Sequence, residues 1–170
     1  MRISIAALFI VLSFSACKTD DTFIFEIPYG PLEFSVPPGL SVLNYHQFTV
    51  PLDASTVLDF VSQGRTYNEI VPSEAFIQSL VPQQDLSFAR DISLTICEAG
   101  ETDPNCGLEI FWKNPTDFDE ATPSNLWANE NDISALLESG DVVIKIKFSQ
   151  LRSTTVQELN LFLNLQFVAR

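Results

Sequence analysis

Apolar side chains recur at every second position along much of the chain. The pattern is strongest near the C-terminus, where alternate positions carry Leu159, Leu161, Leu163, Leu165 and Phe167. Successive side chains of a β-strand point to opposite faces, so this row predicts a long strand with one apolar face. The segment 142–149 repeats the pattern, with Lys145 and Lys147 among the residues of its other face. The polar stretch 150–155 between the two segments predicts that they form an antiparallel hairpin.

Weaker alternation predicts further strands. It runs through residues 23–28, 32–36, 40–50, 76–81, 92–97 and 108–113. Prolines interrupt or border these runs at positions 28, 31, 37, 38, 51, 72 and 82. Because proline has no N–H to donate, we expect these residues at strand ends or on edge strands. About eight short strands separated by turns predict an all-β fold, specifically an antiparallel two-sheet β-sandwich.

Two short helices are predicted in the connections between strands. The first begins at the capping residue Ser55 and ends at Gly64. The second begins at Asn131 or Asp132 and ends at Gly140. Serine, asparagine and aspartate are common N-caps, and glycine commonly follows a helix end. We expect the apolar positions of these helices to plug the open ends of the sandwich.

The N-terminal segment has the three-part layout of a secretory signal. Arg2 precedes an apolar stretch over residues 3–12, and the small residues Ser15 and Ala16 precede Cys17. The apolar stretch is shorter than the roughly 20 residues that a membrane-spanning helix needs, so we expect it to be removed. Cleavage after Ser15 and cleavage after Ala16 both fit the small residues.

Counting cysteines favours cleavage after Ala16 with modification of Cys17. The chain has three cysteines, and modifying Cys17 leaves Cys97 and Cys106 as an even pair. An exported protein with an odd free thiol would be unusual in an oxidising compartment. Cys97 and Cys106 border a short acidic loop between two predicted strands, so we expect a disulfide that staples this hairpin. A catalytic or metal-binding pair is the alternative, but Cys-x-x-Cys is absent and the chain has one histidine.

The segment Ser15-Ala16-Cys17 resembles the lipobox of bacterial lipoproteins. The following Lys18-Thr19-Asp20-Asp21 resembles the export signals of surface lipoproteins from Bacteroidetes. The resemblance implies a signal peptide over residues 1–16, a lipidated Cys17 in a tether over residues 17–22, and a β-sandwich domain over residues 23–170. It also implies attachment to the outer membrane, on its periplasmic or cell-surface side. Two or three acyl chains on one cysteine would make the attachment close to permanent.

Composition indicates one folded, acidic domain. Hydrophobic residues make up 46% of the chain and include 14 phenylalanines, enough for a substantial core. The formal charge is −13, and removing residues 1–16 takes away one arginine and no acid, which leaves −14. Such a surface repels phosphate backbones and anionic headgroups, so binding to nucleic acid is excluded. The predicted membrane contact therefore comes from the lipid alone.

The sequence contains no recognisable catalytic motif. His46 lies in a strand-like run, and Gly-x-Ser-x-Gly is absent. We therefore expect His46 to be an ordinary strand residue with a hydrogen-bonding partner, rather than part of a nucleophilic triad.

Acidic residues cluster in three places near aromatic residues. The clusters are Asp117, Asp119 and Glu120; Glu130 and Asp132; and Glu101 and Asp103. Paired carboxylates beside aromatics suit a glycosidase, and oxygen-rich loops suit calcium. With 22 acids in the chain, clusters also arise as ordinary solvated loops. The aromatic residues nearby are expected in the core or at its rim: Phe111, Trp112, Phe118 and Trp127.

Together these features predict a lipid-anchored protein of the cell envelope that is a non-enzymatic binding or structural module, with no cofactor and no metal. The partner would be an extracellular polymer or a protein, bound through loops at one end of the sandwich or through a sheet edge. One alternative is a small carbohydrate-active enzyme that uses Asp117, Asp119 or Glu120. Another is a carbohydrate- or calcium-binding domain that uses the acidic loops. A third is a small hydrophobic ligand held between the sheets. The sequence predicts no oligomeric state.

Overall fold

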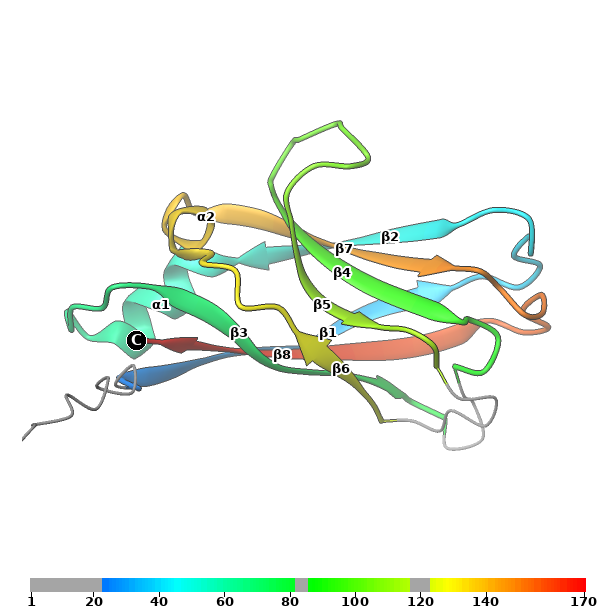
Figure 1. Ribbon diagram of the computed structural model, residues 1–170, viewed down its shortest axis with the longest axis horizontal. Helices are drawn as coiled ribbons and strands as arrows, with labels where there is room; N and C mark the ends of the chain where they lie inside the picture. Colours follow the sequence, from blue (N-terminus) through cyan, green and yellow to red (C-terminus); the bar gives the residue numbers. More distant parts are fainter. Residues whose placement is uncertain (1–22, 82–85, 117–122) are drawn as a thin grey trace, which may run out of the picture.

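The computed structural model describes residues 23–81, 86–116 and 123–170, in which eight strands and two helices follow one another (Figure 1). The strands are β1 (Phe25–Val36), β2 (His46–Asp53), β3 (Ile70–Ser79), β4 (Asp91–Glu98), β5 (Leu108–Lys113), β6 (Ser124–Ala128), β7 (Asp141–Ser149) and β8 (Leu159–Ala169). The helices are α1 (Ala54–Ser62), after β2, and α2 (Ser134–Glu138), before β7. The predicted all-β class with two short connecting helices is confirmed.

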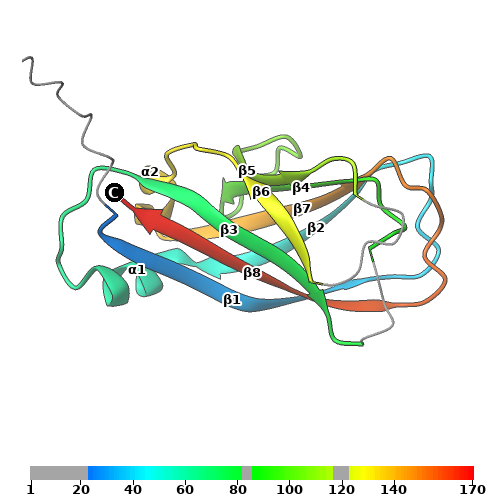
Figure 2. The same ribbon diagram turned by 60° about the horizontal axis from the view of Figure 1, so that its bottom comes forward.

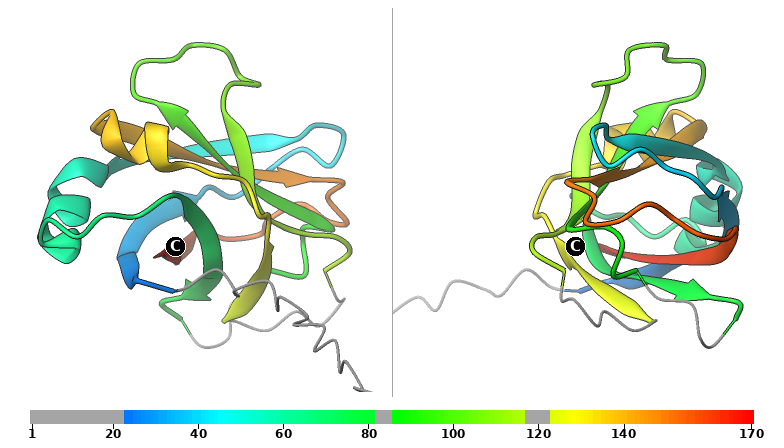
Figure 3. Two further views of the ribbon diagram at one scale, coloured as in Figure 1. Left: turned by 60° about the vertical axis from the view of Figure 1, so that its left-hand side comes forward. Right: turned by 90° about the vertical axis from the view of Figure 1, so that its right-hand side faces the viewer.

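All paired strands are antiparallel and form one eight-stranded sheet in the order β1-β8-β3-β6-β5-β4-β7-β2. The sheet curls on itself, so that the outermost strands β1 and β2 approach each other (Figures 2 and 3). Strand β6 pairs with β3 on one side and with β5 on the other. Because β6 joins the two halves, the sheet has a nearly closed, barrel-like shape. The predicted division into two separate sheets is therefore not confirmed.

The predicted hairpin between the last two strands is wrong, although both strands are present. Strand β7 pairs with β2 and β4, whereas β8 pairs with β1 and β3 in the other half of the sheet. The connecting segment does not turn back but crosses one end of the barrel. The Arg152 N–H donates to the Phe88 carbonyl at 2.8 Å, and Thr155 Oγ1 donates to the Pro37 carbonyl at 2.8 Å. These bonds hold the crossing segment against loops from both halves.

Prolines mark the edges of the sheet, as predicted. Pro28 and Pro31 lie in β1 and Pro51 lies in β2, the two outermost strands in the sheet order. Pro72 lies in β3, an interior strand, next to a register shift between Pro72 and Glu74. Strand β6 pairs with β3 only over residues 75–77, so Pro72 also stands where one side of its strand has no ladder partner.

The core fills the inside of the curled sheet. The row of apolar residues from Leu159 to Phe167 on β8 points inward, and every member of the row is buried. On β7 the inward row ends at Phe148, whose ring contacts those of Phe34, Phe48 and Phe88 at centroid distances of 5.3–6.5 Å. These rings come from β1, β2 and the loop before β4. They pack the seam where the two edge strands approach without pairing to each other.

Both helices lie at one end of the barrel, beside the C-terminus (Figures 1 and 3). Helix α1 is capped by Asp53 rather than Ser55, since the Thr56 N–H donates to Asp53 Oδ1 at 3.1 Å. Leu58 of α1 and Leu137 of α2 are buried, which confirms that the helices plug this end. No helix within the described residues is both long enough and apolar enough to cross a membrane.

Candidate ligand-binding site

The outer face of the half-sheet β2-β7-β4-β5-β6 carries a transverse row of hydrogen-bonding and aromatic side chains. Strand registers pair Gln47 with Lys147, Lys147 with Ser93, Ser93 with Trp112, and Trp112 with Trp127. Register partners in an antiparallel sheet lie directly opposite each other on the same face. One row across five strands therefore begins with polar groups and ends with two indoles.

A second row runs parallel to the first, two residues along the strands. Here Thr49 pairs with Lys145, Lys145 with Thr95, and Thr95 with Glu109. The register of β4 and β5 shifts between Leu94 and Thr95, yet Thr95 and Glu109 remain opposite each other. Lysine, threonine and glutamate are therefore presented on the same outer surface as the first row.

The loop between β4 and β5 bends over these rows. A disulfide between Cys97 and Cys106 closes the loop, with their Cα atoms 5.8 Å apart, which confirms the predicted bridge. The Lys145 amine donates to the backbone carbonyl of Asp103 at 2.6 Å and so ties the loop to β7. Gly107 ends the loop at a φ of +79°, and a Cβ atom there would lie 1.8 Å from the Ile96 carbonyl oxygen. Only glycine fits this close approach.

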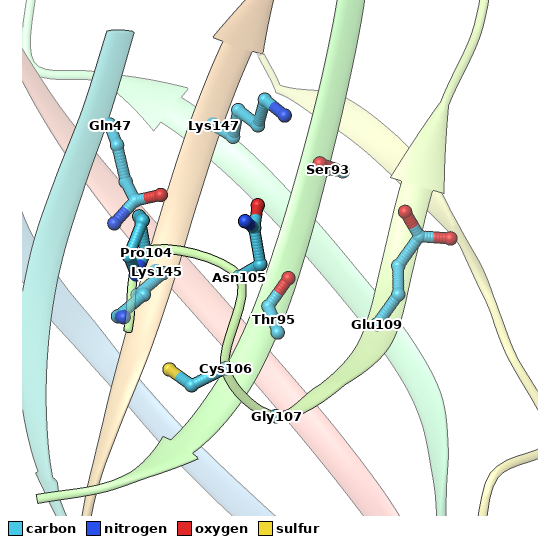
Figure 4. Close-up of a pocket in the computed structure, with 10 residues that line it drawn as sticks. All are labelled: Gln47, Ser93, Thr95, Pro104, Asn105, Cys106, Gly107, Glu109, Lys145 and Lys147. Atoms are coloured by element: carbon cyan, nitrogen blue, oxygen red, sulfur yellow. The ribbon is translucent and has the colours of Figure 1, made fainter. Parts of the chain in front are cut away.

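The loop and the two rows enclose a half-open hollow of about 260 Å³ on the outer surface, which we call the lysine hollow (Figure 4). Its lining consists of Gln47, Ser93, Thr95, Pro104, Asn105, Cys106, Gly107, Glu109, Lys145 and Lys147. Figure 4 shows Asn105 of the loop between Gln47 on one side and Thr95 on the other, with the Lys147 amine directed toward Ser93. Amides, hydroxyls and the Lys147 ammonium group are therefore available together to a ligand.

The two lysines make the hollow locally positive on an acidic protein. Within the described residues neither Lys145 nor Lys147 forms an ion pair with a carboxylate. Lys145 is only 7% exposed, whereas the Lys147 amine lies 4.4 Å from the centroid of the Tyr45 ring. The carboxylate of Glu109, at the opposite side of the hollow, accepts a hydrogen bond from Asn129 Nδ2 at 3.1 Å. The cationic charges of the hollow therefore have no fixed counter-ion among these residues.

The indole pair continues the first row beyond the hollow. The rings of Trp112 and Trp127 meet edge to face, with centroids 4.6 Å apart. Phe111 is fully buried, as predicted, but Trp127 is 50% exposed. The prediction that Trp127 belongs to the core or its rim is therefore wrong, because its position on β6 points outward. Phe118 lies outside the described residues.

The predicted acidic clusters do not converge on a site where the structure describes them. In the disulfide loop the Glu101 carboxylate accepts from the Asp103 N–H, and the Asp103 carboxylate accepts from the Asn105 N–H. These bonds stabilise turns within the loop. No group of three or more His, Cys, Asp or Glu side chains within the described ranges could hold a metal ion. Asp117, Asp119 and Glu120 lie outside the described residues.

Of the two acids that follow Trp127, Asp132 forms hydrogen bonds to the backbone and to Ser134, whereas Glu130 is exposed. Oδ1 of Asp132 accepts from the Ile70 N–H of β3 and from both the N–H and the hydroxyl of Ser134. Partial burial opposes ionisation of Asp132, but these hydrogen bonds outweigh it and lower the pKa of the carboxyl. Asp132 thus connects the start of α2 to β3.

His46 and Cys17 complete the predicted residues. His46 begins β2, and its Nε2 lies 2.9 Å from the Ser41 carbonyl, as expected of a strand residue with a hydrogen-bonding partner. Cys17, the signal segment 1–16 and the tether 17–22 lie outside the described residues.

The lining of the lysine hollow was not predicted as a site. Its signal in the sequence is the alternation that places Lys145 and Lys147 on one face of a strand in a chain with nine cationic residues.

The fold and the site together define an all-antiparallel β protein with a polar hollow on its outer surface. Comparison of the chain with family profiles, with curated protein sequences and with solved structures found no match. The function is therefore inferred from the residues of the hollow.

Proposed function

We propose that this protein is a lipid-anchored, non-enzymatic binding module of the cell envelope, and that its ligand binds in the lysine hollow. The observation that carries the proposal is the pair Lys145 and Lys147, which face a half-open space without a carboxylate partner. Crowding two cations costs free energy that a bound anion would offset: the Asp103 carbonyl engages Lys145, and within the described residues no carboxylate engages Lys147. The neutral hydrogen-bonding groups beside them give such a ligand further contacts.

The lining of the hollow favours binding over hydrolysis. Among the residues that the structure describes, Glu109 is the only carboxylate side chain that lines the hollow, and it accepts a hydrogen bond from Asn129. A glycosidase needs two carboxyl groups, about 5 to 10 Å apart, on either side of the bond that it cleaves. The lining therefore suits a binding module better than the alternative of a carbohydrate-active enzyme.

Anchoring through Cys17 would leave the hollow accessible. Ile24, near the first described residue, donates its N–H to the Ala169 carbonyl at 2.9 Å, so the chain enters the barrel beside its C-terminus at the helical end. A lipid a few residues upstream would hold this end toward the outer membrane. The lysine hollow lies on the outer face of β2, β7, β4 and β5, where a polymer beside the membrane could reach it.

The anchoring half of the proposal is tested in cells that express the full chain. We expect wild-type protein to incorporate labelled palmitate, to accumulate as a precursor with globomycin, and to lose both properties in Cys17→Ser. Protease treatment of intact cells then separates the cell surface from the periplasm. Incorporation of label by Cys17→Ser would contradict the anchor.

The binding half is tested with the purified lipoprotein in detergent. Insoluble envelope and extracellular polysaccharides should retain wild-type protein, and the double variant Gln47→Ala/Lys147→Ala should lose this retention. Glu74→Ala/Gln78→Ala, on the outer face of β3, is the matched control and should be retained. A polymer that becomes shorter during the incubation would instead support an enzyme, and equal retention of both double variants would contradict the site.

A further inference from the structure

We propose that the ligand of the lysine hollow is an acidic glycan in which a carboxylate-bearing sugar binds at Lys147 and a sugar ring farther along the same chain packs on Trp127. The inference rests on the proposed binding function and adds the chemical class of the ligand. It joins two features that the first transverse row places on one surface, the cation at one end and the exposed indole at the other.

The spacing along the row suits a short run of linked sugars. Neighbouring strands lie about 4.8 Å apart, so Lys147 and Trp112 are separated by roughly 10 Å, with Ser93 between them, and Trp127 is one strand farther. A carboxylate at Lys147 therefore places the next rings of the same chain over Ser93 and the indole pair. Trp127 is half exposed, and its apolar face is available for the C–H side of a sugar ring.

The charges favour a ligand with sparse carboxylates. Lys147 has an aromatic neighbour, Tyr45, but no carboxylate partner within the described residues. The ammonium of Lys145 is fixed on the Asp103 carbonyl and adds positive potential beneath the loop. The protein as a whole carries many more acids than bases and repels dense polyanions. A glycan with one carboxylate in each disaccharide presents a single anion to the lysines and little charge elsewhere.

The remaining lining groups match sugar hydroxyls. Gln47 and Asn105 offer amides that both donate and accept, and Ser93 and Thr95 offer hydroxyls. Such groups can bind neutral hydroxyls on either side of the carboxylate. The lining thus supplies the mixed donors and acceptors that a polyhydroxylated ligand requires, beside one cationic end.

Strand pairing argues against an extended peptide as the ligand. Peptides often bind by adding a strand to an open sheet edge. Strands β7 and β4 form the floor of the hollow, and each pairs with a strand on both sides. Strand β7 lies between β2 and β4, and β4 lies between β7 and β5. Their backbone groups are therefore already engaged in the sheet, and recognition must come from side chains on the outer face.

The experiment uses the full-length lipoprotein in detergent and two probes, oligosaccharides of hyaluronan and of unsulfated chondroitin, which both carry one carboxylate in each disaccharide. Each probe has a matched neutral control, the same oligosaccharide with its carboxylates reduced to alcohols. We expect at least one carboxylated probe to bind and to change tryptophan fluorescence, with its neutral control at least about tenfold weaker, since one charge-assisted contact is worth at least that factor. Lys147→Ala should weaken carboxylated binding by about tenfold or more, and should leave the neutral control unchanged.

Trp127→Ala should weaken binding of the same probe and reduce the fluorescence change. Glu74→Ala, on the opposite outer face, should do neither. Thermal melts of each variant, expected within a few degrees of wild type, show that the variants fold. Equal affinity for carboxylated and reduced oligosaccharides, lost in Gln47→Ala/Lys147→Ala, would overturn the acidic class while leaving the proposed binding site standing.

Three further outcomes would overturn the inference. Binding that no hollow variant alters, or no binding of either carboxylated probe at millimolar concentration, would overturn the inference. Binding that no hollow variant alters would also contradict the proposed binding site. If neither probe binds, the binding site is tested separately by the retention of the protein on insoluble envelope and extracellular polysaccharides. Tighter binding of poly-glutamate than of either oligosaccharide would assign the hollow to an acidic peptide and also overturn the inference.

Discussion

The two outer faces of the curled sheet have hollows of similar size and different chemistry. The face over β3 and β6 has a hollow of about 290 Å³ lined by Ser73, Glu74, Ala75, Phe76, Asn125 and Leu126. The lysine hollow measures about 260 Å³ but contains two lysines and lies beneath a disulfide-closed loop. Size therefore does not separate a site from an ordinary surface depression. Cations without counter-ions and a loop held in place do separate them.

Both faces arise from the same period-two pattern, so their difference comes from the connections and from a few outward residues. On β8 the outward positions are Asn160, Phe162, Asn164, Gln166 and Val168, and none of these side chains carries a charge. On β7 the equivalent positions include Lys145, which anchors the disulfide loop through Asp103. One outward lysine thus holds the disulfide loop over the face of β7.

Removing the disulfide should have the largest effect on stability, and that effect should be confined to the face that carries the lysine hollow. Cys97→Ser/Cys106→Ser removes the loop closure and should lower the free energy of unfolding by about 2 to 3 kcal/mol in the chain-entropy model. Denaturant titration measures this loss. Hydrogen exchange should accelerate over residues 99–107 and at the outer edge of the hollow, while the amides of β8 stay protected. Uniform acceleration across both faces would show that the loop does not act locally.

The structural features that the sequence predicted correctly are those that depend on residues near one another in the chain. The run 108–113 becomes β5 with the same bounds, the leucine row becomes the buried face of β8, and the cysteine spacing yields the bridge. Each of these features depends on residues close together in the chain. Period and spacing are sufficient to find them.

The features that were missed depend on distant pairing. Strand β6 is short and pairs over few residues on either side, so its five residues show too little periodicity to predict a strand. The separation of β7 from β8 also has no local signal, because alternation reveals a strand but not its partner. The lysine hollow combines residues from Gln47 to Lys147 through registers across several strands. Only the folded sheet brings these residues together.

The next contrast concerns the lysine that holds the loop. Lys145→Met keeps the apolar stem but removes the amine that donates to the Asp103 carbonyl, and should destabilise the protein by about 1 to 2 kcal/mol because this hydrogen bond has a charged donor. Gln78→Met, an exposed substitution on the outer face of β3, should stay within about 0.5 kcal/mol of wild type. Chemical denaturation of both variants provides the comparison. Equal losses of unfolding free energy in the two variants would mean that the hydrogen bond from Lys145 to the loop does not stabilise the protein.

A smaller contrast lies between the indole pair and an aromatic residue on the other face. A double-mutant cycle of Trp112→Ala and Trp127→Ala should give a coupling energy of about 0.5 to 1.5 kcal/mol, as expected for edge-to-face rings. The matched cycle uses Phe162 and its register partner Gln78, which form no ring pair, and should be additive within about 0.5 kcal/mol. Additive behaviour of the two tryptophans would show that the pair is not preorganised for stacking.

The smallest expected effect concerns Asp132, whose hydrogen bonds indicate a structural role rather than a binding role. Hydrogen bonds from Ser134 and Ile70 lower the pKa of Asp132, so its contribution to stability is present above about pH 4, the unfolded value, and is lost as pH falls through the lower folded value. Because Asp132 is largely exposed, this contribution should be a few tenths of a kcal/mol. Asp132→Asn should flatten the dependence of the unfolding midpoint on pH below about 4.

Glu130→Gln provides the control two residues away, because the Glu130 side chain is exposed and accepts no hydrogen bond within the described residues. Its profile between about pH 2 and 5 should follow that of wild type. Identical profiles for Asp132→Asn and Glu130→Gln would contradict a structural role for Asp132. A flattened profile for Asp132→Asn alone would show that this acid stabilises the junction of β3 with the start of α2 through the hydrogen bonds from Ile70 and Ser134.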